Sequence, residues 1–130
     1  MERGQDGVSE STARRQRALA RLAELGDEPG GEEFLAKMGV LGDWIVDYAF
    51  GDVHTRPGLE ARERELIILA VLAALGSSDS QVRAHIRALR AIHVPWEQIE
   101  ETILQITPYA GIPRAVNAIK VLRDEQEASG

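Results

Sequence analysis

The stretch RERELIILAVLAALG, from Arg62 to Gly76, decides the fold class, because its second half is apolar on every side. The expected helix, from about Glu60 to Leu75, begins with charged residues and then loses all polar character. A helix that is apolar all round has to be buried all round. We therefore expect this helix at the centre of the core of an all-helical protein. Runs that alternate apolar and polar residues, as strands require, are missing from the chain.

The segments upstream of this stretch carry turn signals and helical spacing. A polar helix is expected from about Ser11 to Leu25, ending at Gly26, and a second from about Glu32 to Phe50. Residues 51–60, GDVHTRPGLE, have turn chemistry and little periodicity, so we expect an ordered loop there.

The segments downstream predict three further helices, which makes about six in all. They begin near residues 77–79, 95 and 113, and end near residues 92, 108 and 127. In the first of them, an apolar stripe should face inward and three arginines should face water (Val82, Ile86 and Leu89; Arg83, Arg87 and Arg90).

Length, charge and cysteine content limit the class of protein. The 130 residues suit a single domain, with a polar helix and turn over residues 1–31 and the main body over residues 32–130. A net charge of −6 and no basic run argue against nucleic-acid or membrane-surface binding. With no cysteine, disulfides and thiolate chemistry are excluded. Without a leader-like or membrane-spanning apolar run, we expect a cytoplasmic protein. The large apolar content predicts burial between subunits.

His85 is the most informative candidate for chemistry. Its neighbours three residues before and four residues after, Val82 and Leu89, place the imidazole on or beside the buried stripe. Two interpretations are open: an acid or base tuned by its surroundings, or a core histidine bonded to a backbone carbonyl. His93, beside Val94, is expected to be a helix-end cation or a turn residue. No metal-ligand spacing such as HExxH is present, so no metal is expected.

The remaining candidates each have two interpretations. Arg56 lies near His54 in a loop fixed by proline and glycine, and it is suited either to clamping a carboxylate or to pairing with Asp52 or Glu60. Arg64 and Glu65 lie in a charged helix start, which is usually solvated, although one of them could reach the edge of the core. Tyr109 is a possible proton donor or oxyanion partner, or a packing residue with one satisfied hydroxyl.

Three motifs together resemble the carboxymuconolactone decarboxylase family: FGDVHTRPGL (Phe50–Leu59), RERELIILAVLAALG, and QVRAHIRAL (Gln81–Leu89). The later segment VPWEQIEETILQITPYAGIPRAVNAIKV, from Val94 to Val121, matches the typical second half of that family. Thiol-dependent peroxidases of the same superfamily carry a CxxC pair before the histidine. Ser78 and Gln81 stand at those positions here, so thiol chemistry is excluded.

The resemblance implies an all-helical fold, a ring oligomer such as a trimer or hexamer, and a cofactor-free site. It implies loss of CO2 from a small carboxylated lactone, such as 4-carboxymuconolactone, to give an enol-lactone. His85 would be the proton donor or relay. Arg56 would bind a substrate carboxylate, Arg64 would be a second clamp, and Tyr109 would line the pocket.

Two positions depart from the decarboxylase pattern. His54 stands where an aromatic residue, typically tryptophan, is usual, and Glu65 stands where a small polar residue is usual. Both would add acid–base groups to His85. The alternatives are therefore an isomerisation, cyclisation or rearrangement on the same fold, or a non-catalytic ligand-binding or assembly protein.

Overall fold

A computed structural model describes residues 3–130, with side chains described from Glu10 onward, and over this range the chain is helical without a strand. The fold class predicted from the sequence is confirmed. The chain forms two compact units, Met1–Ala61 and Arg62–Gly130, and each is described by itself. No helix in the described range combines the length and the apolar character that a membrane span requires.

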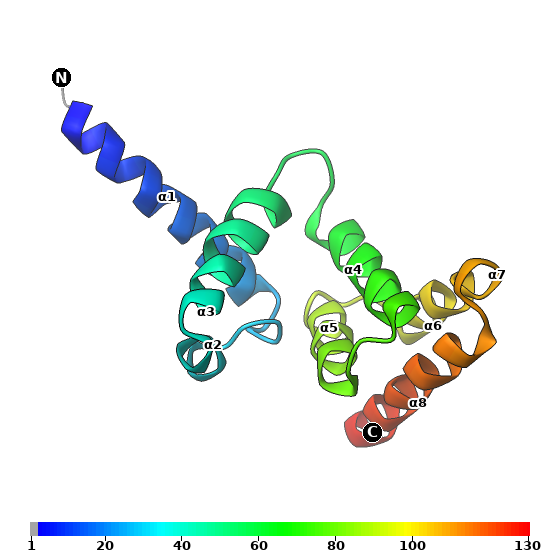
Figure 1. Ribbon diagram of the computed structural model, residues 1–130. Coiled ribbons are helices and arrows are strands. Elements are labelled where there is room, and N and C mark those ends of the chain that lie inside the picture. The colour runs from blue at the N-terminus through cyan, green and yellow to red at the C-terminus, as the bar shows by residue number, and fades with distance from the viewer. Residues whose placement is uncertain (1–2) are drawn as a thin grey trace. The chain divides into compact units, whose positions relative to one another are not determined.

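Unit 1 is built on helix α1 (Arg3–Glu24), which packs against the π-helix η1 (Ile45–His54) (Figure 1). The contact is close because Gly51 has no side chain: a Cβ there would lie 3.0 Å from the carbonyl oxygen of Arg14. Two arginines of α1 bind carboxylates of η1 that lie before and after Gly51 in the sequence. Arg14 binds Asp52, and Arg15 binds Asp47. A π-helix of this length is rare, and such turns occur often at functional sites.

The single helix expected from Glu32 to Phe50 is wrong. The chain instead forms α2 (Glu32–Met38), α3 (Val40–Trp44) and then η1, with a break at Gly39, whose φ of 60° glycine adopts readily. Gly42 lets α3 fold back closely on α2, since a Cβ there would overlap the carbonyl of Leu35. The loop expected over residues 51–60 begins only after His54, because η1 continues through the first four of these residues.

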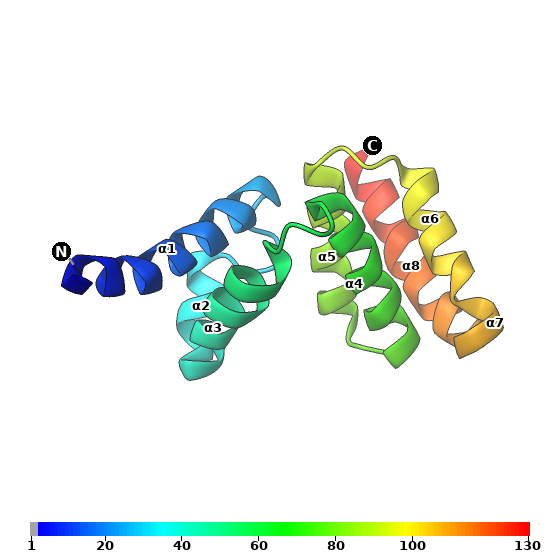
Figure 2. The same cartoon turned by 90° about the horizontal axis from the view of Figure 1, so that it is seen from above.

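Unit 2 contains the other five helices of the described chain: α4 (Ala61–Leu75), α5 (Asp79–Ala91), α6 (Trp96–Gln105), α7 (Thr107–Ala110) and α8 (Ile112–Ser129). Figure 2 shows α8 lying between α5 and α6, which agrees with its contacts. The predicted inward stripe of α5 is confirmed, because Val82, Ile86 and Leu89 are all buried. The turn after α5 uses His93 in the left-handed region, with a φ of 68°, as the turn interpretation expected.

Helix α4 is not buried on all sides, so that prediction is wrong. Leu69 and Ala73 are buried, but Ile67 and Val71 are about half exposed and Leu75 is 68% exposed. Within unit 2 the neighbouring helices cover only one side of α4, and the outer side is apolar. The apolar sequence of α4 therefore predicted more burial than unit 2 provides.

The prediction that the arginines of α5 face water is confirmed for Arg87 and Arg90, which are exposed, whereas Arg83 is only partly exposed. Arg83 and Arg87 both bind the carboxylate of Glu125 on α8, which is only 8% exposed. The hydrogen bonds from Arg87, with the charge of both arginines, hold the pKa of Glu125 below its ordinary value. This cluster ties α5 to α8 across the edge of the core.

Candidate functional site

The centre of the candidate site in unit 2 is a buried pair formed by Glu65 of α4 and His85 of α5. Nδ1 of His85 lies 2.7 Å from Oε1 of Glu65. Glu65 is fully buried and the side chain of His85 keeps 9% of its exposure. The interpretation of His85 as a histidine bonded to a backbone carbonyl is therefore wrong, since its partner is a carboxylate. The expectation that Arg64 or Glu65 reaches the core is confirmed for Glu65.

This pair has the chemistry of a proton relay. An ionised carboxylate accepts a hydrogen bond from Nδ1–H of the imidazole, which leaves Nε2 as the nitrogen that exchanges a proton with another molecule. The carboxylate also stabilises the imidazolium when Nε2 is protonated. Because the pair is buried, the attraction between the two charges is only weakly screened by water.

The candidate residues of unit 1 lie at the end of η1. His54 is buried, with 3% exposure, and its ring stacks on that of Phe50 with the centroids 4.9 Å apart. Nη1 of Arg21, on α1, lies 2.8 Å from Nδ1 of His54 and donates to the backbone oxygen of His54 at 2.5 Å. His54 is therefore held from two sides, by an aromatic ring and by a guanidinium.

Arg56 follows directly in the connection after η1, and its side chain is exposed. Its backbone N–H donates to the carbonyl of Val53 at 3.2 Å, which fixes the turn that presents it. Asp52, one of the partners considered for Arg56, binds Arg14 through both of its oxygens instead. That contact holds the pKa of Asp52 below its ordinary value.

The two other candidates are on unit 2. Arg64 is partly buried on α4, one residue before Glu65. Tyr109 is 89% exposed on α7, so the interpretation of Tyr109 as a packing residue does not hold within this unit. Gly111, with a φ of 93°, turns the chain directly after this short helix, as the YAGIP sequence predicted.

Comparison with known proteins shows which family the sequence matches. The pattern of the carboxymuconolactone decarboxylase family matches residues 40–124, well over half of the chain. The chain belongs to the carboxymuconolactone decarboxylase family. The match extends across both units and includes all six candidate residues, from His54 to Tyr109.

Two relatives each match part of the chain. A 4-carboxymuconolactone decarboxylase of Acinetobacter baylyi is 40% identical over 83 residues, which are 64% of this chain and 60% of that protein. A Paracoccus denitrificans protein, described as an uncharacterized 15.0 kDa protein in the nqo9-nqo10 intergenic region, is 29% identical over 78 residues. That match covers 59% of this chain and 58% of the relative. The chain thus spans about three fifths of each relative.

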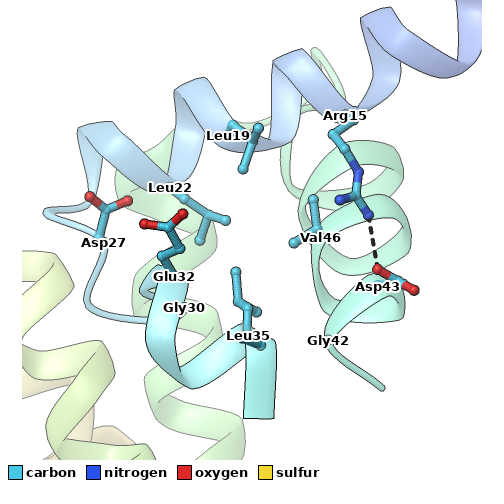
Figure 3. Close-up of a pocket in the computed structure, with 11 residues that line it drawn as sticks. Arg15, Leu19, Leu22, Asp27, Gly30, Glu32, Leu35, Gly42, Asp43 and Val46 are labelled. Carbon is cyan, nitrogen blue, oxygen red and sulfur yellow. Dashed lines mark hydrogen bonds and ion pairs between the residues drawn. The ribbon is translucent and has the colours of Figure 1, made fainter. Parts of the chain in front are cut away.

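A hollow of about 390 Å³ lies in unit 1, and sequence reasoning did not predict it. Figure 3 shows Leu22, Leu35 and Val46 around it, with Arg15 bound to Asp43 at its edge. None of the six candidate residues lines this hollow, and much of its wall comes from α1 and α2, outside the part that matches the family. Among the described residues, no group of three or more His, Asp or Glu side chains is placed to hold a metal ion.

Sequence reasoning missed two charged residues that the structure shows to be important. Arg21 was not predicted because it lies in a polar helix. The available signal was its position three residues after the buried Ala18 and one residue before the buried Leu22. Glu125 continues the buried spacing of Val121 and Leu122, and that spacing was the available signal. In both cases the partner is far away in the sequence.

Proposed function

We propose that this chain is a cofactor-independent decarboxylase that acts on a small carboxylated lactone, such as 4-carboxymuconolactone. The observation that carries the proposal is the buried Glu65–His85 pair, in a chain of this family, without any cysteine. The matched relative named as a 4-carboxymuconolactone decarboxylase supports the choice of substrate.

The proposed reaction requires the protein to manage charge and a proton. When the C–CO2 bond breaks, its electron pair moves through the ring alkene onto the lactone carbonyl and forms an enolate. The substrate itself accepts the electrons, so a cofactor is not needed as an electron sink. The enolate then takes a proton at carbon, and the products are CO2 and the enol-lactone.

In the proposed mechanism His85 returns that proton from Nε2, and Glu65 stabilises the imidazolium that gives it up. Positioned acid–base groups of this kind contribute about 10²–10⁴-fold in rate. Arg56 and Arg64 bind substrate carboxylates, since a guanidinium pairs with a carboxylate through two hydrogen bonds. Tyr109, with its exposed hydroxyl, contributes a hydrogen bond to the substrate. His54 is the third acid–base candidate.

The test is turnover of γ-carboxymuconolactone by purified protein, followed as CO2 release and enol-lactone formation. We expect turnover by the wild type and a loss of about 10²–10⁴-fold in His85→Gln. His93→Asn is the matched control, because His93 is exposed and asparagine tolerates its left-handed backbone. A folded wild-type protein that releases no CO2 would overturn the substrate assignment. Rearrangement of the lactone without CO2 release would instead support an isomerase built on the same pair.

We also propose that the chain works as a homo-oligomer. Each unit leaves an apolar face in contact with solvent: Val40, Leu41, Trp44 and Tyr48 in unit 1, and Ile67, Val71, Leu75 and Ile112 in unit 2. Faces of this kind are typical of interaction surfaces. Sedimentation analysis should give a mass of several chains, and Val71→Glu should lower it. A monomer at micromolar concentration would contradict the proposal.

A further inference from the structure

The hollow of unit 1 has an apolar wall that is open to solvent. Leu22 and Val46 in this wall are buried, whereas Leu19, which also lines the hollow, is 48% exposed. Its volume of about 390 Å³ lies within the range of small-molecule sites, about 300–1,000 Å³. Such sites are mostly apolar and have a few polar groups that fix the ligand. The charged residues of the hollow therefore indicate which kind of molecule fits it.

Three of the four charged residues that line the hollow are carboxylates: Asp27, Glu32 and Asp43, beside Arg15. The arginine is bound by two carboxylates already. Its Nη2 donates to Asp43 at 3.3 Å, and its Nε and Nη2 donate to the two oxygens of Asp47 at 2.9 and 3.0 Å. The positive charge of Arg15 is thus balanced, and the charge that remains in the lining is negative.

That negative charge is concentrated at one end of the hollow. Figure 3 shows Asp27 and Glu32 at this end, and Arg15 with Asp43 at the other. The backbone fixes the place of Asp27, which has a φ of 57° and donates its N–H to the carbonyl of Leu22 at 2.8 Å. Among the residues that the structure describes, no side chain forms a hydrogen bond or an ion pair with either of these two carboxylates.

We propose that this hollow is a binding site for a small organic ammonium ion, which carries one protonated amine on a short apolar body. The ammonium group pairs with Asp27 and Glu32, while the apolar body packs on Leu22, Leu35 and Val46. An ammonium ion has three N–H donors, so a single group can serve both carboxylates. The shape of the ligand thus follows the layout of the hollow, with its charge at one end.

Other ligand classes fit this lining less well. An anion would meet three carboxylates and an arginine that is already bound twice. A neutral apolar molecule would fill the space but would leave the two carboxylates at the end of the hollow without a cation. The proposal is independent of the proposed decarboxylase, because none of the six candidate residues lines the hollow and the lactone of that reaction is an anion.

The first test compares three probes that share the same alkyl chain: hexylammonium, hexan-1-ol and hexanoate. The amine of hexylammonium resembles that of lysine and is protonated at pH 7. The probes are titrated into protein with ¹³C-labelled methyl groups, and nuclear Overhauser effects to Leu22, Leu35 and Val46 locate the chain. Because an ion pair at an exposed rim contributes about 2–5-fold, hexylammonium should bind several-fold more tightly than hexan-1-ol, and hexanoate should bind most weakly.

Two outcomes of this comparison would overturn the proposal. Equal binding of the three probes, or tightest binding of hexanoate, would show that the carboxylates do not select the ligand. Absence of contacts between hexylammonium and these methyl groups at millimolar concentration would show that the hollow does not take an ammonium ion.

The second test removes the two charges and keeps the size of the side chains. The double variant Asp27→Asn/Glu32→Gln should bind hexylammonium about 3- to 20-fold more weakly and hexan-1-ol as the wild type does. Asparagine tolerates the left-handed backbone at residue 27. The matched control is Glu28→Gln/Glu33→Gln, which changes the net charge equally at neighbouring residues that do not line the hollow. Equal losses in the two double variants would assign the effect to net charge and overturn the proposal.

The third test fills the hollow. Ala36 lines it from an exposed position on α2, so Ala36→Phe should fold and should abolish the binding of hexylammonium and hexan-1-ol alike. Glu33→Phe, on the same helix but outside the lining, is the control and should bind both probes normally. Unchanged binding in Ala36→Phe would place the probes elsewhere. A smaller assembly in Ala36→Phe, with no probe contacts in the wild type, would assign the hollow to a second copy of the chain and overturn the proposal.

Discussion

His85 is the buried histidine of unit 2 and His54 is the buried histidine of unit 1, and the two differ in the charge of the side chain that contacts them. Each is buried, each is contacted at Nδ1 by a charged side chain from another helix, and each lies in the part of the chain that matches the family. For His85 that side chain is the carboxylate of Glu65, and for His54 it is the guanidinium of Arg21.

The comparison shows that the position of a histidine in a family pattern does not tell which side chain contacts its ring. A side chain that contacts the ring can lie outside the pattern, as Arg21 does, since the family match begins at residue 40. A change in the partner is therefore the sharpest way to test the comparison.

The largest effect is expected for Glu65→Gln. An amide oxygen can still accept from Nδ1–H of His85, but the charge that stabilises the imidazolium is lost. We expect kcat to fall by about 10²–10³-fold, as for the loss of a positioned acid–base group. Turnover of the lactone measures it, with retained helix content by circular dichroism as the control for folding. A variant with the wild-type kcat would break the comparison, because the charge at Nδ1 would then be irrelevant.

The next effect concerns Arg56, the proposed anion clamp of unit 1. Arg56→Ala should lower kcat/KM by about 10–100-fold, mostly through KM, because a charged hydrogen-bonded contact is worth about 1.5–3 kcal/mol. Arg56→Lys should fall between the two, since lysine keeps the charge and loses the two-pronged geometry. Steady-state kinetics over a range of lactone concentrations measures both. A loss confined to kcat would assign Arg56 to the proton-transfer step instead.

A smaller effect is expected for the other buried carboxylate of unit 2, Glu125. Its partners are Arg83 and Arg87, which keep their charge, so we expect this carboxylate to be structural, whereas Glu65 is proposed to take part in the reaction. Glu125→Gln should lower the free energy of unfolding by about 1–3 kcal/mol, as for the loss of a buried charged partner, and leave the kinetics near those of the wild type. Urea denaturation at pH 7 measures the free energy of unfolding.

The pH dependence of that effect has a definite sign. Because the pKa of Glu125 is lowered in the folded state, its contribution is fully present above the ordinary glutamate pKa of about 4.3. It is lost as the pH falls through the lowered pKa, where the folded protein takes up the proton. The difference in unfolding free energy between wild type and Glu125→Gln should therefore shrink only in acid. A difference that grew on acidification would contradict the assignment.

Helix content and the inward stripe of α5 could be predicted from the sequence, because both depend on local spacing. The break at Gly39 and the π-helix could not, because the segments beside them pack against residues distant in the sequence or in another helix, Gly42 against Leu35 and Gly51 against Arg14. The apolar half of α4 predicted full burial, but apolar character does not say what packs against each side of a helix. The exposed outer side of α4 is where that reasoning failed.

The candidate site divides in the same way. Glu65 and His85 could be nominated because the spacing places both at the edge of the apolar stripes. Their mutual contact, across twenty residues of sequence, could not be derived from either helix alone. The contact of Arg21 could not be predicted for the same reason. A polar helix gives no local indication of which arginine contacts a histidine thirty-three residues later.

The smallest effect is expected at Gly51, where α1 and η1 approach most closely. A Cβ there would lie 3.0 Å from the carbonyl oxygen of Arg14 and 3.2 Å from that of Val46. Crowding of this kind costs about 1–3 kcal/mol, and the better helix propensity of alanine offsets up to about 1 kcal/mol. Gly51→Ala should thus lower the free energy of unfolding by about 1 kcal/mol, whereas Gly58→Ala, with nothing within 4 Å, should not.

The same variant also tests the comparison between the histidines. Arg21 reaches His54 only because α1 lies close to η1, so pushing the helices apart by a few tenths of an ångström lengthens the contact at Nδ1. The ¹⁵N chemical shifts of His54 should then change, while those of His85, whose partner is on α4, stay unchanged. Equal movement of both histidines would mean that the substitution acts on the whole protein and not through Arg21.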